Sequence, residues 1–290
     1  MTGKIGIIGG SGFYNIDGIK NVKKVKVMTP FGKPSDDFVT GVLGGKAVVF
    51  LARHGQGHTT LPSEINYRAN IYGMKKLGVK QIISVSACGS LKEELKPLDI
   101  VIPDQFIDRT NIGRLMTFFG DGIVAHIQFA DPVCTQLAKA LAEAGRKAGA
   151  NVHLGGTYIN MEGPQFSTKA ESKLYRAWGV DIIGMTNLAE AKLAREAEVC
   201  YATIACITDY DCWRMDEGSG GSVSLEMIIA NLCKNVDVSK RIIKTVLPDL
   251  GGKRSCACAT ALEDSIVTRP EFISAKTKKK LKLIIGKYIK

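Results

Sequence analysis

The sequence predicts an α/β fold with a mainly parallel sheet, and two observations support this. Short apolar runs recur along the chain, and several are apolar throughout, as expected for strands that are covered on both faces. Segments with helical spacing lie between them. No Pro-, Ser- or Gly-rich linker divides residues 1–249 into halves, and they contain no internal repeat, so we expect them to form one domain.

The expected strands are short apolar runs that alternate with helical segments. Because helical connections join strands in parallel, we expect most of these strands to pair that way. In chain order they are Lys4–Ile8, Lys24–Val27, Ala47–Leu51, Gln81–Val85, Asp99–Ile102, Tyr158–Met161, Asp181–Ile183 and Val199–Ile207.

Two helices are predicted from the residues that begin them. Asp131 can cap a helix whose first position is Pro132. Thr168-Lys-Ala-Glu171 has the pattern of a capping box and opens a second helix towards Trp178.

Two further helices follow. Asn187 opens one of them. The other is long, lies within residues 222–247 and has an apolar stripe formed by Leu225, Ile228, Ile229 and Leu232.

The net charge of +11 is concentrated at the C-terminus. Residues 276–290 contain seven lysines and no acidic residue, so the other 275 residues carry only +4. We therefore expect 250–290 to be an extension with a Cys-x-Cys segment and a solvated, weakly ordered lysine-rich tail. A nucleic-acid partner would require basic residues spread over one face with stacking aromatics, which +4 does not supply.

Membrane insertion and secretion are not expected. No run approaches the ~18 apolar residues that a spanning helix needs. The N-terminus lacks a basic segment followed by an apolar one and a cleavage site. We expect a cytoplasmic protein with no membrane partner.

Eight cysteines occur, and none lies in a C-x-x-C pair. Several stand inside apolar runs, which favours buried, inert thiols in a reducing compartment. Cys256-Ala-Cys258 is the exception, since it lies in a polar segment. Two interpretations stay open for it, a strained disulfide and half of a metal site.

Polar motifs follow several expected strands, at the end where open α/β sheets bind ligands. Gly9-Gly-Ser-Gly12 can turn backbone N–H groups towards an anion, although a tight structural turn is the alternative. It is not a dinucleotide fingerprint, because Asn15 holds the third glycine position. Ser84–Ser90 predicts a strand followed by a turn of small residues that a ligand can approach closely.

Arg53 and His54 follow another strand. Arginine binds phosphate or carboxylate through two parallel hydrogen bonds, so this position suits an oxyanion. His54 and His58 are four residues apart, but Gly55 and Gly57 oppose the helix that would align them as metal ligands. No metal is expected there.

Asp209 and Asp211 follow the last apolar strand. Their spacing of two predicts that both project to the same side. Close carboxylates raise each other's pKa, so one can hold a proton near neutrality and act as a general acid. Helix capping is the alternative role.

Seven motifs occur in order along the chain. They are Gly9–Gly12, Thr29–Ser35, Leu51–Gly55, Ala87–Ser90, Asp104–Arg109, Glu162–Ser167 and Thr208–Trp213. With these motifs, the chain resembles the 5′-methylthioadenosine phosphorylases of the trimeric purine nucleoside phosphorylase family over about residues 3–249. The resemblance implies a single-domain α/β/α sandwich around a mixed, partly barrel-like sheet, and a homotrimer with active sites near subunit interfaces.

The reaction implied by the resemblance is phosphorolysis. Inorganic phosphate, a co-substrate rather than a cofactor, attacks C1′ of the nucleoside and releases adenine and 5-methylthioribose 1-phosphate. No cofactor is expected. The positions that match the family's phosphate site are Ser11, Arg53, His54, Ser86, Ala87 through its backbone, and Thr186.

The resemblance also assigns the nucleoside site. Asp209 and Asp211 match the carboxylates that bind adenine, and we favour Asp209 as the proton donor to N7. The remaining positions are Met185 at the ribose, Phe166 and Ser167 near sugar and base, Leu225 and Ile228 at the methylthio group, and His126 from the neighbouring subunit.

Base selectivity follows from two positions. Relatives that cleave 6-oxopurines have asparagine in place of Asp209 and glutamate in place of Ser167, so this sequence favours a 6-aminopurine. The alternative is a phosphorylase of purine nucleosides or methylthioinosine. Gln165, where the family usually has arginine, and the glycine-rich 214–221 are departures that keep adenosine as a second substrate. A non-catalytic nucleoside-binding protein is a further alternative.

Overall fold

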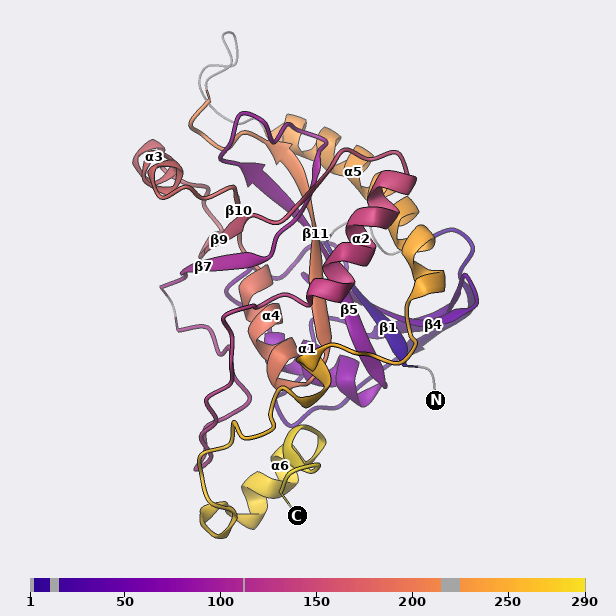
Figure 1. The fold of residues 1–290 in the computed structure, drawn as a ribbon, viewed down its shortest axis with the longest axis vertical. Helices are drawn as coiled ribbons and strands as arrows, with labels where there is room; N and C mark the ends of the chain where they lie inside the picture. The colour runs from indigo at the N-terminus through magenta and orange to yellow at the C-terminus, as the bar shows by residue number, and fades with distance from the viewer. Residues whose placement is uncertain (1–2, 11–15, 112, 215–224, 290) are drawn as a thin grey trace.

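The computed structural model describes residues 3–10, 16–111, 113–214 and 225–289 (Figure 1). Within these residues, eleven strands form one mixed sheet. The Ser11 prediction and the first residues of the long helix, 222–224, lie outside the described residues.

Four parallel strands form the centre of the sheet. Their order is β4 (Lys46–Ala52), β1 (Lys4–Gly9), β5 (Val79–Ser90) and β11 (Cys200–Asp209). Parallel strands end at the same edge, so the residues that follow these four strands are brought together.

The outer strands make the sheet mixed. β5 pairs with β1 through its first half, and with the antiparallel β10 at Gly89 and Ser90. The fold expected from the resemblance, a mixed sheet between helical layers, is confirmed. The outer strands are β2 (Lys20–Val25) and β3 (Phe38–Leu43) beyond β4, then β10 (Ile182–Gly184), β9 (Thr157–Met161) and β7 (Gln105–Arg109) beyond β5, and β6 (Ile100–Ile102) and β8 (Val152–Leu154) beyond β11.

Successive side chains of a strand point to opposite faces of the sheet, so its apolar strands place apolar side chains on both faces. Helices cover both of these faces. Ile7 of β1 packs in a core with α2 (Thr135–Lys147) and α5 (Leu225–Val246). Ile8 packs in a second core with α1 (Tyr67–Lys76) and α4 (Asn187–Glu196). None of the described helices is long and apolar enough to cross a membrane.

The predicted helix starts are confirmed in part. Thr168 and Glu171 form the expected capping box at α3 (Lys169–Ala177). α2 instead begins three residues after Pro132, because the backbone N–H of its N-cap, Cys134, donates to the Tyr201 carbonyl at 2.9 Å. The helix thus begins where the chain reaches β11.

Two strand predictions need correction. β5 continues without a turn to Ser90, because β11 and β10 supply hydrogen-bonding partners as far as that residue. The expected strand Lys24–Val27 lies earlier, as β2.

The prediction of a weakly ordered tail is wrong. The tail forms α6 (Ala275–Ile285), seen at the lower end of Figure 1. Leu281, Ile284 and Ile285 are each 1% exposed and pack in the same core as α1 and α4. Their i, i+3, i+4 spacing gives the helix an apolar face that the surrounding lysines obscured.

Candidate active site

A cavity of about 850 Å³ lies at the carboxyl ends of the four central strands. It brings together ten of the predicted residues. These are Arg53, His54, Ser86, Ala87, Phe166, Met185, Thr186, Asp209, Asp211 and Ile228.

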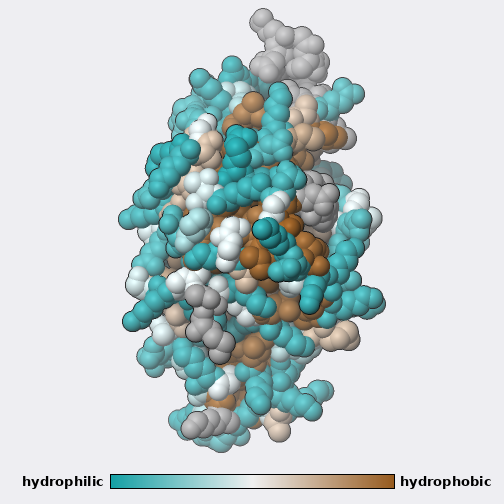
Figure 2. Space-filling view, turned by 90° about the vertical axis from the view of Figure 1, so that its right-hand side faces the viewer, coloured by the Kyte–Doolittle hydropathy of each residue, from teal (hydrophilic) through white to brown (hydrophobic). Residues whose placement is uncertain are grey.

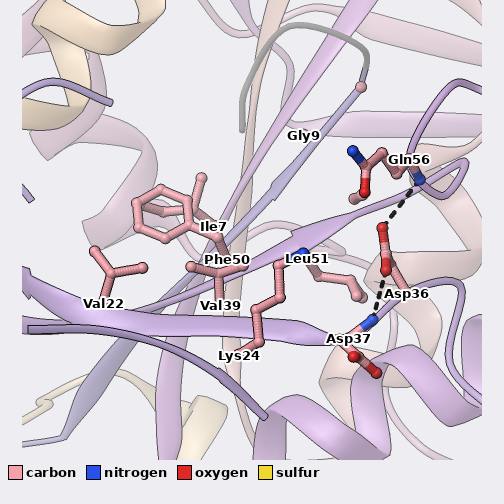
Figure 3. Close-up of a pocket in the computed structure, with 12 residues that line it drawn as sticks. Ile7, Gly9, Val22, Lys24, Asp36, Asp37, Val39, Phe50, Leu51 and Gln56 are labelled. Atoms are coloured by element: carbon pink, nitrogen blue, oxygen red, sulfur yellow. Dashed lines mark hydrogen bonds between the residues drawn. The ribbon is translucent and has the colours of Figure 1, made fainter. Parts of the chain in front are cut away.

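A smaller cavity of about 420 Å³ lies beside β1, β3 and β4, and Gly10 borders both cavities. Figure 2 views the side of the molecule where these strands lie and shows apolar residues gathered between hydrophilic ones. In the close-up, Val22, Val39 and Phe50 form the apolar wall, while Asp36 accepts from the backbone N–H of Gln56 at 2.9 Å (Figure 3). Asp36 also accepts from the backbone N–H of Asp37 at 2.7 Å. The larger cavity is the stronger candidate for chemistry, because the predicted residues gather there.

Arg53 is held by a buried ion pair that the sequence did not predict. Its Nε lies 2.5 Å from Glu190 Oε1, and its Nη1 donates to the Val85 carbonyl at 3.0 Å. Burial alone lowers the pKa of Arg53, but the charge and hydrogen bond of Glu190 outweigh it and raise that pKa. The guanidinium is therefore fixed, charged and rigid at the cavity wall.

His54 is neutral at the cavity. Its pKa falls to about 4, first because burial disfavours the charged ring and next because Arg53 is near. The ring stacks on His58 with centroids 4.2 Å apart. Nδ1 lies 2.8 Å from the Thr60 carbonyl, which can only accept, so Nδ1 carries the proton and Nε2 is an acceptor.

The N-terminus of α4 also faces this end of the cavity. Thr186, its N-cap, is buried and lines the cavity, and its side chain does not cap the helix. The positive end of the helix dipole favours an anion at such a position. With Ser86 and Ala87 of β5 beside it, this end suits an oxyanion.

The two aspartates line the same cavity. Asp209 Oδ2 accepts from Thr208 Oγ1 at 2.7 Å, and Oδ1 accepts from the Asp211 backbone N–H at 2.8 Å. Burial raises the pKa of Asp209, and the charge of Asp211 is the smallest of the causes. The sequence argument expected carboxylate repulsion to dominate, whereas desolvation does.

Asp211 reaches the cavity by a turn rather than along a strand. β11 ends at Asp209, and Asp211 has a positive φ of 50°. Ser167 Oγ donates to Asp211 Oδ1 at 3.1 Å, so Ser167 lies behind this carboxylate and orients it. The predicted shared side is correct, but the strand geometry used to predict it is not.

Met185 is positioned by a residue that the sequence did not single out. Arg114, whose side chain is 1% exposed, pairs with Glu162 at 2.9 Å and donates to the carbonyls of Met185 and Glu162. Asn160 also donates to the Met185 carbonyl, at 3.1 Å. Arg114 thus links Glu162 to Met185. The sequence did not reveal this role because Arg114 is distant from both residues along the chain.

The remaining predictions lie at or beyond the rim. Phe166 lines the cavity and is 58% exposed, while Ile228 of α5 adds an apolar wall. Leu225 begins α5, but its side chain lies outside the described residues. His126 is exposed and does not line this cavity; its backbone N–H donates to the Ser265 carbonyl at 2.8 Å.

Residues 4–248 match the family model described as Phosphorylase superfamily. The chain belongs to this superfamily. It is 60% identical over 289 residues to the S-methyl-5′-thioadenosine phosphorylase of Geobacter sulfurreducens, with all of both chains covered. It is 57% identical to that of Koribacter versatilis, covering 99% of this chain and 97% of the relative.

Solved structures agree with the sequence relatives. A methylthioadenosine phosphorylase from an antarctic soil metagenomic library has a TM-score of 0.91 at 50% identity, over 98% of this chain and 99% of that one. A mutant of the adenosine/methylthioadenosine phosphorylase of Schistosoma mansoni, in complex with adenine, has a TM-score of 0.85 at 38% identity, over 91% and 99%. The resemblance inferred from the seven motifs is confirmed.

Proposed function

We propose that the protein catalyses phosphorolysis of S-methyl-5′-thioadenosine to adenine and 5-methylthioribose 1-phosphate, and that adenosine is a second substrate. It would be a pentosyltransferase that uses inorganic phosphate as co-substrate and needs no cofactor. The observation that carries the proposal is one cavity lined both by a buried carboxyl of raised pKa, Asp209, and by Thr186 at the N-terminus of α4. The first suits a leaving base and the second an attacking dianion.

At the phosphate end, the groups proposed to bind are Ser11, Arg53, His54, Ser86, the backbone of Ala87, and Thr186. Arg53 supplies a fixed positive charge, since Glu190 and Val85 hold it. Neutral His54 presents Nε2 as an acceptor, which matches the P–OH of a monoprotonated phosphate. Holding the phosphate in line with the scissile bond removes much of the entropic barrier.

At the base end, Asp209 acts as the general acid. A phosphate oxygen forms a bond to C1′ while the C1′–N9 bond breaks and its electron pair moves onto the purine. Asp209 gives a proton to N7, a role that burial favours because it raises the pKa of this carboxyl. Asp211, oriented by Ser167, accepts from the exocyclic amine.

The sugar and the 5′ substituent occupy the apolar part of the cavity. Met185 is proposed to lie against the ribose and Phe166 against sugar and base. Ile228 is proposed to contact the methylthio group, as the resemblance implies for Leu225 too, and His126 is proposed to reach it from the neighbouring subunit of a homotrimer. We propose that the enzyme is cytoplasmic. We also propose that residues 1–249 form the catalytic domain and residues 250–290 an extension to it.

A panel of four nucleosides tests the substrate class. With phosphate present, methylthioadenosine and adenosine should be cleaved, and methylthioinosine and inosine should be cleaved at least about tenfold more slowly, because mismatched buried polar groups cost about 1–3 kcal/mol each. If methylthioinosine or inosine is cleaved faster than methylthioadenosine, the result would instead support a phosphorylase of 6-oxopurine nucleosides.

A further inference from the structure

Four cysteine sulfur atoms converge far from the cavity. The Sγ atoms of Cys134, Cys200, Cys256 and Cys258 all lie within 4.8 Å of one another, and those of Cys200 and Cys256 are 3.4 Å apart. Cys134 is the N-cap of α2 and Cys200 begins β11, whereas the other two belong to the Cys-x-Cys segment of the extension. Cys256 and Cys258 of this segment therefore lie close to two cysteines that are remote in sequence, Cys134 and Cys200.

We propose that these four cysteines, the tetrathiolate cluster, bind one Zn²⁺ as a structural site. Zinc takes four thiolates in a tetrahedron with Zn–S of about 2.3 Å, which places the sulfur atoms about 3.8 Å apart. The observed separations, 3.4 Å for one pair and no more than 4.8 Å for any, bracket this value. A disulfide needs only two sulfur atoms in contact, so the mutual approach of all four favours a shared ligand.

The surroundings favour thiolates. A zinc ion with four thiolates carries a net charge of −2, which a helix N-terminus and a nearby cation stabilise. The Cys134 side chain lies at the N-terminus of α2 and does not cap that helix, and Arg254 Nη1 is 3.8 Å from Cys200 Sγ.

The cluster is closed, as structural zinc sites are. Cys134, Cys200 and Cys258 are at most 7% exposed, and Cys256 is half-buried. Protein sulfur atoms supply all four ligands, which leaves no open position for a substrate or water. The bound ion would fasten the extension to α2 and β11, beside the 2.7 Å hydrogen bond from Gln136 to Ser255.

Binding has a defined proton balance. Zn²⁺ replaces the protons that remain on the four thiols and releases them to solvent, with no change of oxidation state. The metal is thus expected to bind more weakly at low pH and to be removed by chelators.

The test is elemental analysis of the full-length protein expressed with zinc and purified without chelators. We expect about one zinc per chain, and less than about a tenth in Cys256→Ser and Cys258→Ser, because a structural site needs all four ligands. Cys233→Ser, at an exposed cysteine outside the cluster, should keep the full zinc content.

Two measurements on the wild-type protein keep the test independent of how the variants fold. Titration with an organomercurial should release zinc in step with the thiols, and cobalt substitution should give the absorption spectrum of tetrahedral thiolate coordination. A metal-free protein with reactive thiols, two disulfides by intact mass, or iron in place of zinc would each overturn the proposal.

Discussion

At its C-terminal end β11 delivers Asp209 to an open cavity, whereas at its N-terminal end Cys200 joins three other sulfur atoms in a closed cluster. The ten residues of the strand separate these ends by roughly 30 Å. At the first end, polar groups face space that a ligand can fill. At the second, the side chains satisfy one another. Under the two proposals, one strand serves catalysis at one end and attachment of the extension at the other.

The largest effect is expected at the cavity end, from Asp209→Asn. An amide cannot transfer a proton to the leaving base, so kcat/KM for methylthioadenosine should fall about 10²–10⁴-fold. Steady-state assays at saturating phosphate measure it, with the exposed Asp249→Asn as matched control. Turnover equal to that of the control would contradict the role of Asp209 as acid.

Glu190→Gln tests whether the buried ion pair of Arg53 and Glu190 at the cavity contributes to the stability of the protein. It leaves the Arg53 charge buried without its partner, so the free energy of unfolding should fall by about 3 kcal/mol in urea titrations. Lys192→Gln, at the more exposed pair with Asp108, should cost less than about 1 kcal/mol. Equal losses in the two variants would refute the account of the buried pair.

Leu281→Ala tests how the extension contributes to stability. Removing this buried side chain of α6 should lower the free energy of unfolding by about 2–3 kcal/mol through the cavity it leaves. Because α6 does not line the larger cavity, kcat and KM should stay unchanged at a temperature where the variant is folded. Lys282→Ala, on the exposed side of the same helix, is the control. If Leu281→Ala is as stable as Lys282→Ala, the result would contradict the packing of α6 against the core and support a weakly ordered tail.

Ser167→Ala should give the smallest effect. The hydrogen bond that orients Asp211 is lost, which at about 0.5–1.5 kcal/mol lowers kcat/KM for methylthioadenosine about two- to tenfold. Comparison with inosine in the same assay shows whether the loss is specific to the 6-amino group. A loss as large as that of Asp209→Asn would mean that Ser167 contacts the reacting atoms.

The sequence predicted the site well where each residue stands at the end of its own strand. Arg53, His54 and Asp209 follow apolar runs, and the parallel sheet then brings them together. Glu190 and Arg114 were missed because their importance depends on partners distant in sequence, and no periodic pattern reports such pairs.

The tail and the cysteines show the same limit. A run of lysines concealed the spacing of Leu281, Ile284 and Ile285, which only becomes meaningful against the core that α6 covers. The Cys-x-Cys segment left a strained disulfide and half of a metal site open, and Cys134 and Cys200 join it only through the fold. Local patterns identified these features, and tertiary contacts decided their roles.

The phosphate dependence of base release tests the central claim most directly. Methylthioadenosine is incubated with the wild-type enzyme with and without inorganic phosphate, while adenine is followed by chromatography and the sugar product by phosphorus NMR. The account predicts that adenine appears only with phosphate, together with one equivalent of 5-methylthioribose 1-phosphate. Adenine release at the same rate without phosphate, with free 5-methylthioribose as product, would contradict it.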